Sequence, residues 1–282
     1  MNRLITVIFA ILSAVTVSAQ HEFSVYAGGG LSSLNYQIDA GTQKGGLGAH
    51  FGLGYRYELD RNWGVLTGIG MGIFNSTFTS TEEFTSENQA TDNFNANAPV
   101  LFTYKSVVRG YEEKQVASLL QIPLMAQYVY NFSTMDAFVN AGLKFGLPLS
   151  GNYSSNVKQI TNTGVYPNEY EYSVQQFRGF GVYNDKPYNG DLNFKLAVMF
   201  SIEAGTKFEL GNDLSLYVGA FVDIGLNNIH KSVAPHFVEY VEYLDHVADF
   251  RLNSVIHSQY ENFTEKIVPV AAGIKLALAI QR

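Results

Sequence analysis

Eight segments of the chain alternate apolar and polar residues with a period of two, the first more weakly than the others. In the sixth segment, for example, Phe200 and Ile202 have one parity, and Ser201 and Glu203 have the other. A helix would scatter these residues around its circumference, whereas a strand sorts them onto two faces. The pattern therefore predicts eight strands, at residues 23–34, 47–59, 63–78, 116–132, 139–147, 192–210, 214–226 and 268–280.

Short and long connections alternate between these predicted strands. Asp60-Arg61-Asn62, Ser133-Thr134 and Gly211-Asn212-Asp213 have tight-turn compositions, whereas the connections from Asn75, Ser150 and Asn228 each run for roughly 40 residues. This arrangement is typical of an all-β, up-and-down antiparallel transmembrane β-barrel with short periplasmic turns and long extracellular loops. A barrel of ten or twelve strands stays open, because residues 100–108 and 238–244 also alternate.

The N-terminus has the composition of a secretory signal peptide. Arg3 precedes an apolar run from Leu4 to Val17, and small residues end at Ala19. We therefore predict residues 1–19 as a signal peptide and residues 20–282 as one outer-membrane β-barrel domain. The absence of cysteine excludes a lipid-modified N-terminal cysteine and a disulfide framework. The formal net charge of −7 without a basic cluster excludes a nucleic-acid partner.

The polar parity of the strands is rich in glycine and carries charges of both signs. A soluble, lipocalin-like barrel would place this face in water and would carry more long charged side chains on it. Glycines beside opposite charges fit the inside of a narrow tube, where buried charges must be paired. We therefore expect a lumen charge network made of Arg56, Glu58, Lys144, Lys195, Glu203, Lys207, Glu209, Asp223 and Lys275.

Aromatic residues gather on the apolar parity close to the short turns. Amphipathic rings at one end of the strands match the girdle that outer-membrane barrels place at the lipid headgroups. The expected girdle consists of Tyr55, Tyr57, Trp63, Tyr128, Tyr130, Phe132 and Phe208.

Two strands resemble a known family. The strand Leu119-Leu120-Gln121-Ile122-Pro123-Leu124-Met125-Ala126-Gln127-Tyr128-Val129-Tyr130 is similar to the "L-x-I-P-L-L-x-x-Y" strand of the PorT-like outer-membrane β-barrel domain family, relatives of the OmpA and OmpX barrels. The following Phe138-Val139-Asn140-Ala141-Gly142-Leu143 is similar to that family's "Y-V-G-A-G" strand. The resemblance implies an eight-stranded barrel in the outer membrane of a Gram-negative bacterium. It brings no common catalytic residues.

An eight-stranded barrel encloses little more room than its own side chains fill. We therefore expect a filled lumen, a monomer, and a function in the acidic, tyrosine-rich external loops, which suit a protein partner or a surface ligand. Outer-membrane lipid and lipopolysaccharide are the other expected partners. The alternatives are a small porin of ten or more strands and a β-barrel subunit of an envelope secretion complex.

A lipid-modifying enzyme is the remaining alternative. The last loop contains His230, His236, His246 and His257, and Ser258 follows directly, so a base and a nucleophile are available. No G-x-S-x-G motif is present, and the histidine spacings match no metal-ligand pattern. We therefore expect no catalytic residue, no cofactor and no metal.

Overall fold

The computed structural model describes residues 21–281 except for 93–98, 133–134, 168–169, 175–178, 212, 232–233, 243–247, 259–260, 262 and 265. The predicted signal peptide therefore lies outside the described residues, as does His246. The described residues form strands and turns, and no helix among them is long and apolar enough to cross a membrane. The strands are β1 (His21–Asn35), β2 (Gly41–Glu58), β3 (Trp63–Ser80), β4 (Phe84–Asp92), β5 (Val100–Asn131), β6 (Asp136–Tyr166), β7 (Tyr170–Tyr172), β8 (Gly181–Asp191), β9 (Ala197–Glu209), β10 (Leu214–Gly225), β11 (Val238–Glu242), β12 (Ala248–Leu252) and β13 (Val268–Gln281).

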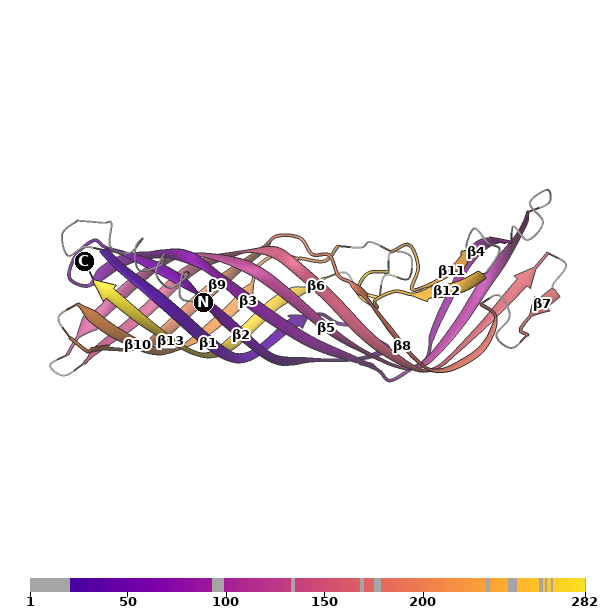
Figure 1. Ribbon diagram of the computed structural model, residues 1–282, viewed down its shortest axis with the longest axis horizontal. Coiled ribbons are helices and arrows are strands. Elements are labelled where there is room, and N and C mark those ends of the chain that lie inside the picture. Colours follow the sequence, from indigo (N-terminus) through magenta and orange to yellow (C-terminus); the bar gives the residue numbers. More distant parts are fainter. Residues whose placement is uncertain are drawn as a thin grey trace, which may run out of the picture.

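Eight of these strands form a ring in which every neighbouring pair is antiparallel. The order around the ring is β1-β2-β3-β5-β6-β9-β10-β13, and β13 pairs back with β1. The ring lies at one end of an elongated molecule, and the C-terminus lies at that end (Figure 1). The predicted eight-stranded up-and-down barrel is confirmed.

The predicted long loops are largely strand, which corrects the sequence interpretation. β5 and β6 have 32 and 31 residues and stay paired with each other far beyond the ring. Residues 100–108 begin β5, and residues 238–242 form β11, whose described pairing is with β12 alone. The alternative of ten or twelve strands in the barrel is therefore wrong. Alternation continues wherever a strand continues, so it could not show where the strands leave the membrane.

The outward face changes character along β5 and thereby marks the edge of the lipid. Between the turn and Val116 it exposes apolar residues such as Leu124 and Tyr130, whereas beyond Val116 it exposes Lys114 and Lys105. An apolar band of this kind is the lipid-facing surface of a transmembrane barrel. We therefore place the outer limit of the membrane-spanning part of β5 at Val116.

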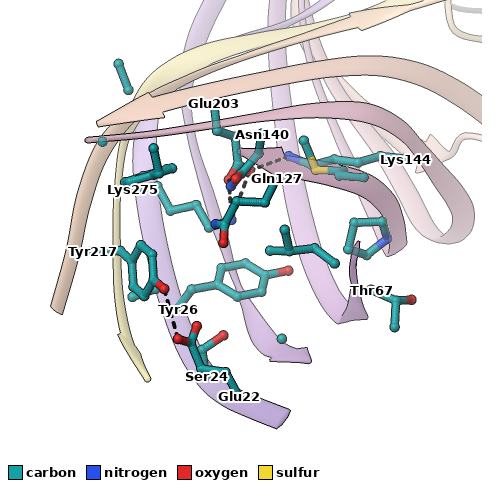
Figure 2. A pocket seen from close by; sticks show the side chains of 18 residues that line it. Glu22, Ser24, Tyr26, Thr67, Gln127, Asn140, Lys144, Glu203, Tyr217 and Lys275 are labelled. Atoms are coloured by element: carbon teal, nitrogen blue, oxygen red, sulfur yellow. Dashed lines mark hydrogen bonds and ion pairs between the residues drawn. The ribbon is translucent and has the colours of Figure 1, made fainter. Parts of the chain in front are cut away.

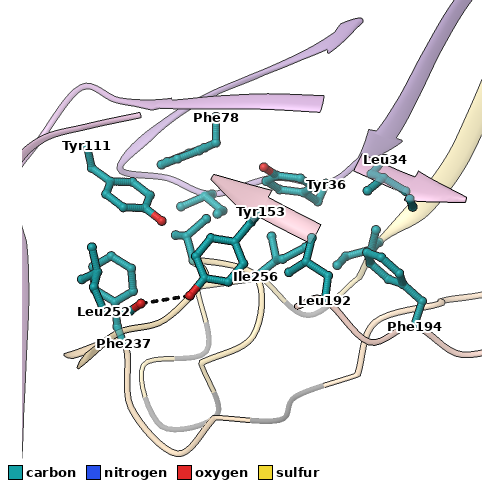
Figure 3. Packing of buried hydrophobic residues seen from close by; sticks show 14 of the residues in the cluster. Leu34, Tyr36, Phe78, Tyr111, Tyr153, Leu192, Phe194, Phe237, Leu252 and Ile256 are labelled. Carbon is teal, nitrogen blue, oxygen red and sulfur yellow. Dashed lines mark hydrogen bonds between the residues drawn. The ribbon is translucent and has the colours of Figure 1, made fainter. Parts of the chain in front are cut away.

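Beyond this limit, β4, β5, β6 and β8 form a curved sheet, which we call the extension together with β7 and the β11–β12 hairpin (Figure 1). Its inner face buries an aromatic and aliphatic cluster that continues down into the upper barrel (Figure 3). Tyr104, Tyr111, Phe102 and Phe237 in this cluster are almost fully inaccessible to solvent. The extension is therefore built as a soluble domain is, with an apolar inside and a polar outside.

The first and last strands meet at a pair of glycines. Gly30 of β1 lies directly opposite Gly273 of β13, and a Cβ on either would overlap the backbone of the other strand. Glycine at both positions lets the two terminal strands approach closely where they join the ring.

We predict that Gly273→Val lowers the stability of the folded barrel by about 1–3 kcal/mol, because the added side chain forces β1 and β13 apart. The midpoint of urea unfolding in detergent micelles measures this loss. Ala272→Val is the matched control, since Ala272 is exposed on the lipid face of the same strand. Equal midpoints for the two variants would contradict the prediction.

Candidate functional site

The middle of the lumen is crossed by a buried ion cluster on four adjacent strands. Lys144 of β6 donates to Glu203 of β9 at 3.2 Å and to Asp223 of β10 at 2.9 Å. Lys275 of β13 donates to Glu203 at 2.9 Å, and the Asn140 amide donates to the same carboxylate at 3.0 Å. All these groups lie in the membrane-spanning part, where an unpaired charge would be costly. The cluster therefore ties β6, β9, β10 and β13 together from the inside.

A second ion cluster lies nearer the end of the barrel where the short turns are. Glu22 of β1 is 3.6 Å from Arg56 and 3.8 Å from Lys207, and it accepts a hydrogen bond of 2.9 Å from the Tyr217 hydroxyl. Arg56 also pairs with Glu58 on its own strand. Since β10 and β13 separate Lys207 from Glu22 in the ring, this contact crosses the lumen.

The structure brings together most of the residues that the sequence placed in the lumen, with two corrections. Lys195 is exposed, because the chain leaves the ladder before β9: Leu192 and Phe194 turn inward there, which reverses the parity. Glu209 keeps the inward parity but is the last residue of β9 and is exposed at the barrel end. Sequence reasoning missed Glu22, because the first segment alternates weakly and was predicted to begin after it.

A small cavity separates the two ion clusters. It has a volume of about 50 Å³, and Tyr26, Gln127 and Thr67 are among the residues that line it (Figure 2). The side-chain oxygens of Gln127 and Asn140 are buried without a protein partner. A cavity of this size has space for water, which would bond to these oxygens. It is far too small for a nutrient-sized solute.

Above the ion clusters, ring side chains pack against one another inside the lumen. The His50 ring packs edge-on against Phe221, with ring centroids 5.0 Å apart, and against Phe74 at 5.7 Å. Lys144 lies 5.6 Å from the centre of the Phe221 ring, so the charged and apolar levels touch. Sequence reasoning missed this level, because Phe221 is an apolar residue on the polar parity of its strand.

The expected girdle residues face outward near the short turns. Tyr57, Trp63, Tyr128, Tyr130, Phe132 and Phe208 are exposed, and Tyr55 is half-buried. Trp63 and Tyr128 pack edge-on across β3 and β5 with centroids 4.9 Å apart, and the Tyr55 hydroxyl is 2.7 Å from His21 Nδ1.

The last loop, which contained the candidate catalytic residues, is anchored inside the extension. The backbone N–H of Asn193 donates to His257 Nε2 at 3.1 Å, and burial lowers the pKa of His257 to about 4. Ser258 donates instead to Glu261, whose pKa is lowered by this bond and by a bond of 2.6 Å from Ser86. His257 and Ser258 thus bond to different partners, unlike a base and its nucleophile. The described residues include no group of three or more His, Asp or Glu side chains placed to hold a metal ion.

Glu113 of β5 fixes the same loop to the sheet. Its buried carboxylate accepts hydrogen bonds from Ser254 Oγ at 2.6 Å, from the Val255 N–H at 3.1 Å, and from Tyr111. A carboxylate that accepts this many bonds holds its donors firmly in place. The loop is therefore part of the packed extension.

The surface of the extension has two features of note, a set of exposed apolar residues and a groove. At its far end Leu101, Tyr170 and Val174 expose 57%, 64% and 55% of their surface, and we call these three exposed residues at the end of the sheet the tip patch. Leu101 points to the outer face of the sheet, whereas Tyr170 lies opposite Tyr166 and points to the inner face. On the side of the extension a groove lies between β8 and β12, and its polar lining includes Asp191 and Arg251.

Three solved structures of outer-membrane proteins are similar to this chain. A solved structure of a major outer membrane protein from Thermus thermophilus aligns over 92% of this chain and 99% of its own, with 13% identity and a TM-score of 0.37. OprG from Pseudomonas aeruginosa aligns over 94% of this chain and 98% of its own, with 11% identity and a TM-score of 0.35. Neisserial surface protein A aligns over 94% and 98% of the two chains, with 7% identity and a TM-score of 0.33. No curated protein matches the sequence.

The family comparison covers most of the molecule. The model of the outer membrane protein beta-barrel domain matches residues 18–231, a range that includes seven of the eight ring strands (β1, β2, β3, β5, β6, β9 and β10). The chain therefore belongs to the outer membrane protein beta-barrel domain family and lies in the outer membrane of a Gram-negative bacterium.

Proposed function

We propose that this protein is a non-conducting, non-enzymatic barrel that holds a binding module outside the outer membrane. The proposal rests on a contrast between the two parts of the molecule. The lumen is filled by ion clusters and by the ring packing at Phe221, whereas the extension encloses an apolar core. A filled lumen leaves the extracellular surface as the part of the molecule that meets other molecules.

The tip patch is the proposed contact surface for a protein partner. Leu101 lies near the start of β5, and Tyr170 belongs to β7, which pairs with the end of β6. These strand ends rest on the aromatic cluster beneath them, where Phe102 stacks on Tyr166 with ring centroids 4.9 Å apart. A rigid base beneath exposed aromatic and aliphatic residues limits the entropy lost on binding.

A second candidate function comes from the PorT-like motif at residues 119–130. As a subunit of an envelope secretion complex, the barrel would use the same tip patch to contact another subunit. Both candidate functions require a stable complex that forms through the extension. They differ in the partner, which is another subunit of a secretion complex in the second candidate function only.

The lumen proposal is tested by conductance together with stability. We expect the wild-type protein to show no steady channels in planar lipid bilayers, because the two ion clusters and the Phe221 level block the lumen. Glu203→Gln should stay non-conducting yet lose about 3 kcal/mol or more of stability, since it leaves Lys144 and Lys275 short of a buried partner.

Glu209→Gln is the matched control, because Glu209 is on the same strand and parity but is exposed. It should unfold as the wild type does. Large, steady single-channel steps from the wild type would overturn the proposal of a filled lumen.

The tip patch is tested by co-purification. We expect Leu101→Ser/Tyr170→Ser to lose at least tenfold in the yield of a stoichiometric partner extracted from the outer membrane in mild detergent, since buried anchors dominate such interfaces. Thr85→Ser is the control, because Thr85 is exposed on β4 opposite Val107, six residues along β5 from Leu101. An unchanged partner yield from the patch variant would contradict the proposed contact surface.

The rigidity of the extension should depend on pH through His257. Its folded-state pKa of about 4 lies below the ordinary value of 6.5, so the opened loop binds the proton more tightly than the closed loop. The contribution of His257 is therefore complete above pH 6.5 and is lost as the pH falls toward 4, by about 3 kcal/mol in total.

Hydrogen exchange of a peptide covering residues 250–258 measures this loss. The ratio of wild-type to His257→Gln exchange at each pH cancels the chemical pH dependence, and glutamine can still accept the bond from Asn193. We expect the ratio to rise on the order of tenfold between pH 7.5 and pH 5. A ratio that stays flat would show that His257 does not couple the loop to pH.

A further inference from the structure

Two lysines and a threonine form a row across three neighbouring strands at the edge of the lipid-facing surface. Lys44 of β2 lies directly opposite Thr77 of β3, and Thr77 lies directly opposite Lys114 of β5. These strands run side by side in the barrel wall (Figure 1). With strands about 4.8 Å apart, the two lysine Cα atoms are roughly 10 Å apart, a gap that their long side chains can close.

The row faces outward. Ser76 and Phe78, on either side of Thr77, are buried, as are Glu113 and Gln115 on either side of Lys114. Because successive residues of a strand point to opposite faces, Thr77 and Lys114 point away from the interior, and both Lys44 and Lys114 are exposed.

The row lies just outside the apolar band. Toward the membrane, the next exposed apolar residue is Leu47 on β2 and Val116 on β5. Away from the membrane, the same face of the extension exposes polar residues. The two ammonium groups are thus at the level where lipid tails give way to charged headgroups.

Neither ammonium group is matched by an acid. Among the described residues, no carboxylate lies within ion-pair distance of Lys44 or Lys114, whereas Lys105 pairs with Glu87 at 2.9 Å and Arg109 with Glu83 at 2.6 Å. Glu112 is the nearest acid along the face of β5, and it is exposed and unpaired with either lysine. The row therefore carries a net positive charge on a chain that is acidic as a whole.

We propose that Lys44, Thr77 and Lys114 bind a phosphate group of the phosphorylated glycolipid, lipopolysaccharide, in the outer leaflet. Two ammonium groups on either side of a hydroxyl provide the donors and the charge that a phosphate requires. A headgroup phosphate bound here would fix the height of the barrel in the membrane on the β2–β3–β5 side.

The full mature chain, folded in detergent micelles, is titrated with lipid A that carries its phosphates and with dephosphorylated lipid A. We expect the wild type to prefer the phosphorylated lipid and Lys44→Gln/Lys114→Gln to lose about thirtyfold in affinity for it. This fold-change corresponds to about 2 kcal/mol, or about 1 kcal/mol for each lysine at a charged lipid surface. Affinity for dephosphorylated lipid A should not change.

Lys158→Gln/Lys186→Gln is the matched control, because both lysines are exposed on the extension farther from the membrane. It should bind as the wild type does, and Lys44→Arg/Lys114→Arg should retain the preference because the charge is kept. Equal binding of the two lipid A forms by the wild type, or equal affinities of the two glutamine variants, would overturn the proposal. Inorganic phosphate alone serves as a third probe. If the wild type binds inorganic phosphate as tightly as phosphorylated lipid A, the assignment of the site to a lipid is overturned.

Discussion

The pairing of β5 with β6 is the interaction on which the rest of the structure depends. Within the membrane it joins the two halves of the ring, so that the backbone groups of β5 and β6 are paired where no water can satisfy them. Outside the membrane the same ladder continues from Ser118 and Ser150 to Thr103 and Val165 and carries β4, β7 and β8 on its edges. One pair of strands thus serves as barrel wall and as the backbone of the extension.

Because the ladder is continuous, the two faces of these strands must exchange their character where the solvent changes. In the barrel, Leu124 faces lipid and Gln121 faces the lumen, whereas in the extension Lys105 faces water and Tyr104 is buried. The inward parity of β5 is reset at Gly110, which has a positive φ, and the inward parity of β6 is reset at Leu149, which the register shift between Ser118 and Leu119 leaves without a partner on β5. Within β5, the inward face therefore changes from polar in the barrel to apolar in the extension, and the outward face changes from apolar to polar.

The sequence predicted the membrane part well because lipid imposes a strict rule on it. A strand that faces lipid on one side must alternate, so Phe200, Ile202 and Glu203 could be assigned to their faces without a structure. The extension obeys weaker rules: its long strands alternate too, but nothing in residues 100–108 distinguishes a strand outside the membrane from one within it. Lys195 was misplaced because parity holds only inside a ladder, and the chain leaves the ladder at Leu192. The tip patch could not be predicted from the sequence, because its position depends on the pairing of β6 with β7.

The buried carboxylates show how the two parts of the molecule solve the same problem by different means. In the barrel, Glu203 is held by two lysines, and the opposite charges keep the lumen close to neutral on strands that are already fixed by the ladder. In the extension, Glu113 has no cation beside it among the described residues and depends on donors from Tyr111, Gln115, Ser254 and Val255. Ser254 and Val255 belong to the last loop, so the carboxylate loses half of its donors when that loop leaves its place. The ion cluster of the barrel strengthens strands that already pair through their backbones. Glu113, in contrast, links the burial of β5 to the ordered position of the last loop.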